Sequence, residues 1–366
     1  MSTKDLERVA YLVGAGATHA SAMSENSPYG LLMNDLANPI RKALGDLGVN
    51  VGADPSLKSL INSLVSDPSI IEHIITFLDQ SVSQIHREFA ERLREAFVVA
   101  LNKVLEDVER ESGGKPNSLY SALIDMHFVQ GNNEQLNGVL TLNYDDYIES
   151  ALLDRLQLDV DYGLRIVTQE HSVQKVPVLK LHGSFSWREV WPVELDPSPK
   201  PLWIPPGVHK PKGRYPFNLI WGRAREILDC DVLRIIGCNL SANDWDLVSL
   251  LFSTNQTRTS CLPYRIEIID HPGNAERIKK EFSYLPISSI FDVDVGDSVA
   301  WEVLAGKIDQ PFSKLQTKRQ GELVEGLEHS NWFRIWLIQK SIEVMEKSAS
   351  LETEAGEFQR FCEEVA

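Results

Sequence analysis

The sequence predicts an α/β protein of the Rossmann-like type, with a doubly wound, mostly parallel sheet and an inserted helical subdomain. Three observations predict this fold: short apolar runs recur along the chain, each run stops at a glycine or polar cluster, and stretches with helical spacing separate the runs. Apolar runs of this kind are typical of strands buried on both faces of a parallel sheet. Ligands of such sheets bind beyond the carboxyl ends of the strands, so the polar clusters mark a candidate site.

Five segments have the character of buried strands, and each ends at residues that can carry chemistry. They span residues 9–13, 138–142, 176–181, 232–236 and 265–269. The first runs into a glycine turn, and the others run into an Asn-Tyr-Asp-Asp cluster, a His-Gly-Ser cluster, a Gly-Cys-Asn cluster and a single aspartate. Because parallel strands share one carboxyl edge, we expect these clusters to lie near one another.

The helical stretches predict how the chain is divided. Residues 34–111 carry apolar side chains at helical spacing, and this block is too long for one crossover, so we place residues 34–116 as the inserted helical subdomain. Residues 9–33 and 117–300 then form one discontinuous nucleotide-binding domain.

Residues 301–366 are expected to form a helical tail. Within it, residues 331–338 are apolar nearly all round. Such a helix is buried either against its own domain or at a subunit contact, and we favour the subunit contact.

The charge balance excludes several classes of protein. The 366 residues include 36 Lys and Arg against 52 Asp and Glu, a formal net charge of −16, which argues against a protein that coats nucleic acid or an anionic membrane. No apolar run reaches the roughly 18–20 residues that a membrane span needs, and the first residues lack the features of a signal peptide, so we expect a cytoplasmic protein. Four cysteines are too few and too unevenly spaced for a disulfide framework or a zinc site, and we expect no metal.

One segment reverses this charge balance. Residues 200–226 hold six basic side chains and one acidic side chain. These cations would guide the phosphates of a ligand or would bind a partner. A solvated loop face is the commoner explanation, and it is the one we favour.

The residues after the strands suggest chemistry, and each also has a structural explanation. Glycines let the backbone approach a phosphate, and the next helix supplies N–H groups and the positive end of its dipole, but a tight turn explains them equally well. His182 exchanges protons near neutral pH and suits a general base, whereas a lone histidine is more often a structural residue. Asn143 can orient a ribose or a water and Asp145 can bind an amide or hydroxyl, while capping of the next helix is the alternative for both.

Taken in order, the clusters resemble the sirtuin family, and more closely the sirtuin-like domains of bacterial anti-phage defence systems. The resemblance covers roughly residues 9–300 and rests on five motifs in the family's order: GAGAT, TLNYDD, KLHGS, GCNLSAND and IEIID. It implies that the ligand is NAD and that the reaction cleaves the bond between nicotinamide and ribose.

The resemblance also implies a role for each matching residue. Asn143 would hold the nicotinamide ribose or the attacking water, Asp145 would lie beside the nicotinamide carboxamide, and His182 would be the general base or the partner of a ribose hydroxyl. The remaining matches would bind the diphosphate and the adenosine half of NAD: Gly14, Ala15, Gly16, Ala17, Thr18, Gly183, Gly237, Asn239 and Asp270.

One difference between this sequence and the sirtuin deacylases bears on which activity of the family we expect. Sirtuin deacylases hold a structural zinc with two cysteine pairs between the histidine motif and the later glycine motif, but that interval here, residues 184–236, contains only Cys230. We therefore expect no zinc, and water becomes the expected nucleophile: NAD would be hydrolysed to nicotinamide and ADP-ribose by an effector that depletes NAD during abortive infection.

A NAD-dependent protein deacylase and a non-catalytic NAD- or ADP-ribose-binding regulatory subunit are the alternatives. As partners, the resemblance implies a homo-oligomer or a second defence component, such as a HerA-type ATPase or an Argonaute-like protein.

Overall fold

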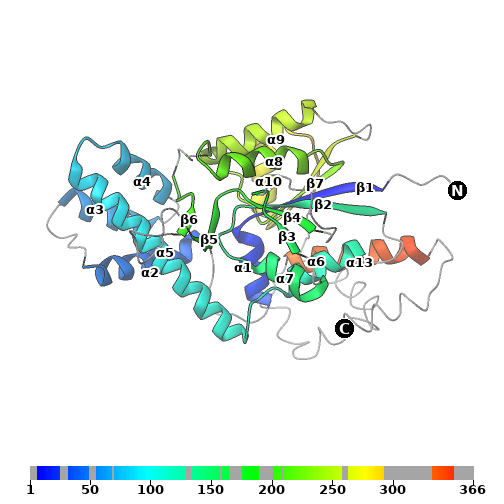
Figure 1. Cartoon of the computed structure of the whole chain (residues 1–366), viewed down its shortest axis with the longest axis horizontal. Helices are drawn as coiled ribbons and strands as arrows, with labels where there is room; N and C mark the ends of the chain where they lie inside the picture. The colour runs from blue at the N-terminus through cyan, green and yellow to red at the C-terminus, as the bar shows by residue number, and fades with distance from the viewer. Residues whose placement is uncertain are drawn as a thin grey trace.

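The computed structural model confirms the predicted fold class: one sheet of seven parallel strands has helices on both faces (Figure 1). The strand order is β3-β4-β2-β1-β7-β8-β9. The strands are β1 (Glu7–Val13), β2 (Glu134–Thr141), β3 (Asp159–Asp161), β4 (Lys175–Lys180), β7 (Val232–Ile236), β8 (Arg265–Ile269) and β9 (Ile287–Ile290). A separate antiparallel pair consists of β5 (Gly183–Arg188) and β6 (Pro201–Trp203). The structure describes residues 6–24, 32–48, 55–67, 70–128, 133–156, 159–164, 175–188, 201–207, 210, 212–257, 263–291 and 332–349.

The five segments predicted as strands are β1, β2, β4, β7 and β8, and their apolar character follows from burial on both faces. In β1, Val9, Tyr11 and Val13 belong to one hydrophobic cluster, while Ala10 and Leu12 belong to the cluster on the opposite face. The first face is covered by α1 (Ala15–Ser24), α6 (Ser118–Phe128), α7 (Tyr147–Leu156) and α13 (Trp332–Ala349) (Figure 1). The second face is covered by α8 (Phe217–Ile227), α9 (Trp245–Thr257) and α10 (Pro272–Glu281).

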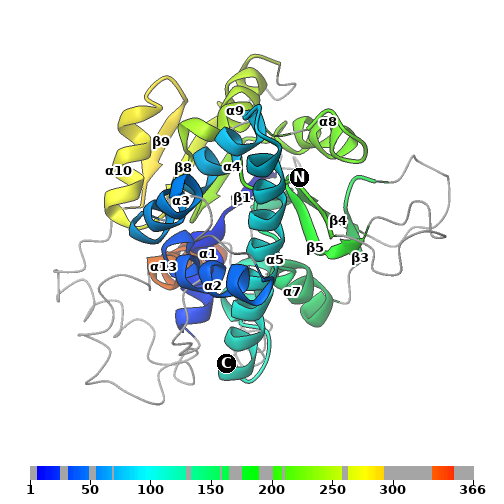
Figure 2. The ribbon, with the colours of Figure 1, turned by 90° about the vertical axis from the view of Figure 1, so that its left-hand side faces the viewer.

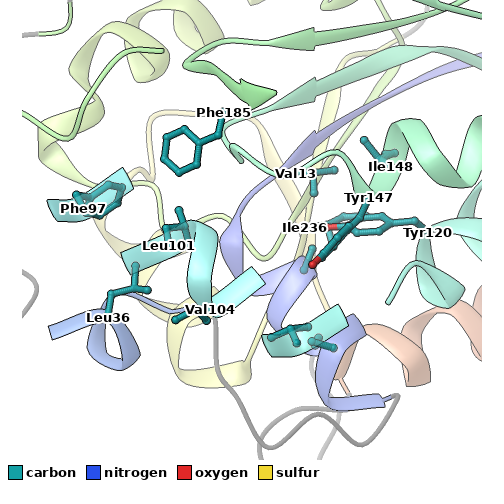
Figure 3. Packing of buried hydrophobic residues seen from close by; sticks show 14 of the residues in the cluster. Val13, Leu36, Phe97, Leu101, Val104, Tyr120, Tyr147, Ile148, Phe185 and Ile236 are labelled. Atoms are coloured by element: carbon teal, nitrogen blue, oxygen red, sulfur yellow. The ribbon is translucent and has the colours of Figure 1, made fainter. Parts of the chain in front are cut away.

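The described residues between α1 and α6 form four helices. They are α2 (Met33–Asp46), α3 (Pro55–Ser66), α4 (Ile71–Gln80) and α5 (Gln84–Ser112). Figure 2 shows α5 running lengthwise through this block, and it ends at Gly113, whose φ of 74° is the left-handed conformation that glycine adopts at helix ends. The buried residues of α2–α5 belong to the same hydrophobic cluster as the first face of the sheet, so the block and that face share one continuous core (Figure 3).

The C-terminal helix α13 packs on its own chain. Phe333, Trp336 and Leu337 are at most 7% exposed and belong to the cluster that includes α1 and α6. The face that we favoured as a subunit contact is therefore buried inside the chain, and the other residues of the predicted tail lie outside the described ranges. None of the helices that the structure describes is both long and apolar enough to cross a membrane.

A fully buried arginine fastens this helix to the sheet. Arg234, in the middle of β7, binds both carboxylate oxygens of Glu134 over 2.7 Å and one oxygen of Glu267 over 2.8 Å. Its guanidinium also lies over the ring of Trp336, 5.6 Å from the centroid, and Lys340 approaches Glu134 within 3.0 Å. Burial disfavours the charged carboxylate of Glu134, but the bonds and charge of Arg234 outweigh burial and hold its pKa well below the usual range.

Candidate functional site

The carboxyl ends of β2, β1, β7 and β8 are consecutive along one edge of the sheet, and this edge carries most of the predicted site. The winding order reverses at β1, because the chain adds β2 and β4 on one side of it and returns to add β7 and β8 on the other. Ligands of doubly wound sheets bind in the crevice at such a reversal. Four adjacent strands span three strand spacings, about 14 Å, so an extended ligand can lie across them.

Three glycines bring the turn after β1 into contact with the turn after β7. The N–H of Gly16 donates to the carbonyl oxygen of Gly237 over 2.9 Å, and the N–H of Gly14 donates to that of Ile236 over 3.0 Å. A Cβ atom on Gly14 would lie 2.5 Å from the Gly237 carbonyl oxygen, and a Cβ atom on Gly237 would lie 2.1 Å from the Ala17 nitrogen. The glycines are therefore required for close approach of two backbone segments. The N–H groups of Gly14 and Gly16 are already bonded and do not cradle a phosphate in this conformation.

Asn143 is held by two hydrogen bonds that fix the direction of its amide. The residue is 7% exposed, and its Nδ2 donates to the carbonyl oxygen of Gly14 over 3.1 Å and to Thr18 Oγ1 over 2.8 Å. Both amide protons are used in this way. The described residues supply no donor to Oδ1, so this oxygen remains to accept a hydrogen bond from a ligand hydroxyl or a water.

The hydroxyl of Thr18 links Asn143 to Asp145. Thr18 Oγ1 donates to Asp145 Oδ2 over 3.1 Å and lies 2.7 Å from the hydroxyl of Tyr120. Because Thr18 has a single proton and gives it to Asp145, Tyr120 is the donor in the second contact. The residue that the resemblance assigned to the diphosphate therefore also sets the positions of Asn143 and Asp145.

A buried lysine supports the loop that carries these residues. Lys180, the last residue of β4, is fully buried; its Nζ donates to the backbone carbonyl of Asp145 and lies 2.8 Å from Glu149 Oε1. Burial raises the pKa of Glu149, and the charge of Lys180 offsets this only in part. Burial likewise raises the pKa of Asp145. A carboxyl with a raised pKa exchanges a proton closer to neutral pH, as a site of proton transfer requires.

These residues open onto a cavity of about 690 Å³. One part of its lining, which we call the polar floor, follows the strand ends and comprises Ala15, Gly16, Thr18, Asn143, Asp145, Gly237, Asn239, Asp270, His271 and Asn274. A second part, which we call the apolar wall, comprises Leu32, Leu36, Phe97, Leu101, Leu105 and Trp332, and His19, Leu142 and Tyr144 complete the described lining. Figure 3 shows Leu36, Phe97 and Leu101 on the side of the inserted helices. An apolar cavity with a few converging polar groups is the usual form of a small-molecule site.

His182 does not line this cavity. It lies in the turn after β4, is 7% exposed, and accepts a backbone hydrogen bond from Ile204 over 2.8 Å. Burial and the charge of Lys210 hold the pKa of His182 well below its usual range, so the imidazole is neutral at physiological pH. Tyr144 connects the cavity to this turn, because it lines the cavity, donates through its hydroxyl to the Ile204 carbonyl over 2.8 Å, and accepts at its own carbonyl from Ser184 Oγ over 2.9 Å.

The end of the polar floor after β8 carries a carboxylate. Asp270 is 6% exposed; its Oδ1 accepts from the His271 N–H and its Oδ2 from Asn274 Nδ2, both over 2.6 Å. Burial raises the pKa of Asp270 to about 6, although these two hydrogen bonds and the positive charge of Arg277 act against the shift. Arg277 does not line the cavity and instead bonds the side-chain oxygens of Asn239 and Asn274.

The basic segment at residues 200–226 is largely paired with carboxylates. Its described ion pairs join Lys210 to Asp244 and Glu72, Lys212 to Asp246, and Arg223 to Glu226 and Asp161. Because Glu72 belongs to α4, Lys210 also ties the helical block to the sheet. Lys210 is 5% exposed, so its ion pairs are buried and differ from the solvated loop face that we favoured, whereas Lys212 and Arg223 are each 42% exposed.

The structure brings eight of the twelve predicted site residues to the cavity and places four elsewhere. The eight are Ala15, Gly16, Thr18, Asn143, Asp145, Gly237, Asn239 and Asp270. The four outside its lining are Gly14, Ala17, His182 and Gly183. Ala17 is fully buried in α1. Gly183 has a φ of 75°, and a Cβ atom there would lie 2.4 Å from the Leu202 carbonyl oxygen, so this glycine serves the pairing of β5 with β6.

Sequence reasoning missed the rest of the lining. His19, Tyr144, His271 and Asn274 line the cavity beside predicted residues, as does the apolar wall. Phe97, Leu101 and Leu105 recur every four residues, a spacing that indicates one helix face but not whether that face meets a core or a ligand. Asn274 comes four residues, or about one helical turn, after Asp270. This spacing could have identified Asn274 as a partner of the Asp270 carboxylate.

Comparisons with known proteins do not assign a function to this site. Neither the protein-family models nor the curated proteins contain a match to the chain. Among the described residues, no three histidine, cysteine, aspartate or glutamate side chains come together as a metal site.

Proposed function

We propose that this protein is a NAD glycohydrolase, which cleaves the bond between nicotinamide and ribose and releases nicotinamide and ADP-ribose. The observation that carries the proposal is the fixed amide of Asn143, whose Oδ1 remains to bind a ligand in a cavity at the winding reversal of the sheet. The identity of the ligand rests on the resemblance of five ordered motifs to sirtuin-like domains.

The chemistry matches what this site offers. The bond from the ribose C1′ to the pyridine nitrogen breaks, nicotinamide leaves as a neutral molecule with the bonding electrons, and a water oxygen bonds to C1′. The transition state has oxocarbenium character, so the site has to orient the ribose and place one water rather than supply a strong acid. Asn143 Oδ1 accepts a hydrogen bond from that water or from a ribose hydroxyl, and Asp145 lies beside the nicotinamide carboxamide.

The proton lost by the water requires a base, and His182 takes this role in the proposal. Its lowered pKa keeps the imidazole neutral, with a ring nitrogen free of a proton, at physiological pH. Burial and the charge of Lys210 also disfavour the protonated ring, so the proposal requires that ligand binding changes these surroundings. Because His182 does not line the cavity, its ring has to come within hydrogen-bond reach when the ligand binds. Tyr144 bonds Ile204 and Ser184. Ile204 in turn bonds the His182 carbonyl, so Tyr144 is the residue through which ligand binding would move His182.

The biological setting rests on the resemblance alone. We propose a cytoplasmic effector that depletes NAD in an infected bacterium, as a homo-oligomer or together with a HerA-type ATPase or an Argonaute-like protein. Uncontrolled loss of NAD would kill the host, so the proposal includes an inactive state that a trigger releases.

One assay separates the proposal from its two alternatives. The purified protein is incubated with NAD alone and with NAD plus an acetyl-lysine peptide, nicotinamide is followed, and NAD binding is measured by calorimetry. Release without peptide supports the hydrolase, release only with peptide indicates a protein deacylase, and binding without release under either condition indicates a regulatory subunit. No binding and no release would contradict all three.

Variants connect the assay to the site. We expect Asn143→Ala to lower the rate of nicotinamide release by about 100-fold or more, because one positioned hydrogen-bonding group is lost at the reacting centre. Asn218→Ala is the matched control, since this asparagine is exposed on α8 and does not line the cavity. Equal turnover by the Asn143→Ala variant and the wild type would contradict the assignment.

A further inference from the structure

The hydroxyl of Thr18 is fully used by three hydrogen bonds. It accepts from Asn143 Nδ2 over 2.8 Å, lies 2.7 Å from the hydroxyl of Tyr120, and donates to Asp145 Oδ2 over 3.1 Å. A hydroxyl has one proton and two acceptor lone pairs, so these contacts occupy all three positions. The direction of this hydroxyl is therefore fixed as long as each of its partners stays in place.

Tyr120 is the partner of Thr18 that does not line the cavity. It lies on α6, is 1% exposed, and has its ring edge-on to that of Phe333 in α13, with 6.1 Å between the ring centroids. Burial and the negative charge of Asp145 raise the pKa of Tyr120 well above its usual range, so the hydroxyl keeps its proton and remains a donor. The packing of α6 against α13 thus holds a hydrogen-bond donor against Thr18 without placing it in the cavity lining.

The bond from Tyr120 supports the two contacts that Thr18 makes in the site. In a buried chain of hydrogen bonds, each bond polarises and strengthens the next. Here Tyr120 donates to Thr18, and Thr18 donates to the carboxylate of Asp145. Because Asn143 bonds the same oxygen of Thr18, the direction of its amide depends on where Tyr120 holds that oxygen.

We propose that Tyr120 is a positioning residue for the hydrolysis of NAD: its hydroxyl holds Thr18 and, through Thr18, the amide of Asn143 at the reacting ribose. This inference rests on the proposed function. Tyr120 itself touches neither the ligand nor the attacking water, and it keeps Asn143 in the orientation that the transition state requires. Loss of the hydroxyl should therefore lower the rate of the reaction and leave binding of the ligand nearly unchanged.

The first test removes the hydroxyl and keeps the ring. We expect Tyr120→Phe to lower kcat for nicotinamide release about tenfold, as the loss of one hydrogen bond does, and to leave KM for NAD within about twofold of the wild type. Tyr11→Phe is the matched control and should keep the wild-type kcat. Tyr11 is also 1% exposed and its hydroxyl bonds His127 and Arg234, but it does not line the cavity.

A double-mutant cycle shows whether Tyr120 acts through Asn143. If it does, Tyr120→Phe should change kcat by less than about twofold when Asn143→Ala is already present, because no oriented amide is left to lose. A substitution that only loosened the fold would lower kcat by the same factor in both backgrounds. Equal factors, or a folded Tyr120→Phe variant with the wild-type kcat, would overturn the inference and leave the hydrolase proposal standing.

A second measurement needs no turnover, because it follows the side-chain amide of Asn143 by nuclear magnetic resonance in protein isotopically labelled at asparagine. Both of its protons are hydrogen-bonded, so both should exchange with water about tenfold or more slowly than those of the exposed Asn218. Tyr120→Phe should speed the exchange of the proton that is bonded to Thr18, and Tyr11→Phe should not. The resonances to follow are those that Asn143→Ala removes.

The outcomes separate this inference from the proposed function. Fast exchange of both Asn143 protons in the wild type would overturn the inference even where Tyr120→Phe does not fold. A wild type that releases no nicotinamide would overturn the proposed function and the catalytic part of the inference, and the exchange rates would then decide separately whether Tyr120 orients Asn143.

Discussion

Arg234 and Lys180 are both fully buried and project from the same face of the sheet, but they differ in how completely their partners satisfy them. Arg234, in the middle of β7, binds three carboxylate oxygens within 2.8 Å and the hydroxyl of Tyr11 within 3.1 Å. Lys180, at the carboxyl end of β4, binds one oxygen of Glu149 and a backbone carbonyl. The second oxygen of Glu149 is buried and has no hydrogen-bond partner among the residues that the structure describes.

The difference indicates a division of labour between the two clusters. The carboxylate that pairs with Arg234 has its pKa lowered, which means that the fold stabilises its charged form. The carboxylate that pairs with Lys180 has its pKa raised, which means that the fold tolerates its charged form only at a cost. We infer that the Arg234 cluster holds helices and sheet together, whereas the Lys180 cluster positions the loop that carries Asn143 and Asp145.

The largest expected effect on stability comes from removing the cation of the Arg234 cluster. We expect Arg234→Met to lower the free energy of unfolding by about 3–5 kcal/mol, because it leaves Glu134 and Glu267 buried without their shared cation. Urea denaturation followed by circular dichroism measures this change. A loss no greater than that of a surface arginine would contradict the structural role of the cluster.

Removing the cation of the Lys180 cluster should affect activity more than stability. We expect Lys180→Met to cost about 1–3 kcal/mol of unfolding free energy, because Glu149 can take up a proton when its cation is removed. We expect nicotinamide release to fall by about 100-fold, because the Asp145 loop loses the contact that positions it. Lys280→Met, at an exposed lysine on α10, is the control for both measurements. Full activity in a folded Lys180→Met variant would show that Lys180 does not position the loop.

The two glutamates should respond to pH with opposite signs. The pKa of Glu134 is below its ordinary value of 4.5, so its stabilisation is complete above that pH and is lost as the pH falls below it. The stability cost of Glu134→Gln should therefore shrink in acid.

The pKa of Glu149 is above 4.5, so the wild type loses stability as the pH rises through the raised pKa. The cost of Glu149→Gln should therefore shrink toward neutral pH. Urea denaturation of both variants and the wild type, from neutral pH to about pH 4, checks both signs; parallel curves would contradict them.

The smallest effect is expected at a surface cation. Arg223 is 42% exposed and pairs with Glu226, which is 62% exposed. Water screens both charges, so Arg223→Ala should change the free energy of unfolding by no more than about 0.5 kcal/mol. The same denaturation experiment gives this reference value, and a loss close to that of Arg234→Met would show that burial does not set the difference.

Five strands could be predicted from the sequence because a strand buried on both faces consists mainly of apolar residues. Val9–Val13 has no charged residue, and β2 and β8 also end at the residues that the motifs identified. β3 and β9 were not predicted, because short strands at the sheet edges bury less apolar side-chain surface and lack the continuous apolar run.

The partners inside the fold could not be predicted. Arg234 stands in the middle of an apolar run, and nothing local indicates that Glu134, about a hundred residues earlier, meets it across the sheet. Asn143 and Asp145 were identified correctly as residues after a strand, and the cavity confirms that they share one lining with Asp270. The position of His182 outside that lining depends on how Tyr144 packs against β5 and β6, which the spacing of a motif does not encode.

The apolar wall has a consequence for biosynthesis. Trp332 belongs to the last helix that the structure describes, whereas Ala15 and Gly16 of the same cavity lining belong to the first. During translation, a nascent chain that has already folded the strands therefore presents a cavity whose apolar wall lacks Trp332, and so does any product truncated before α13. Completion of the apolar wall then waits for α13, so the cavity reaches its final form only after this helix has been synthesised.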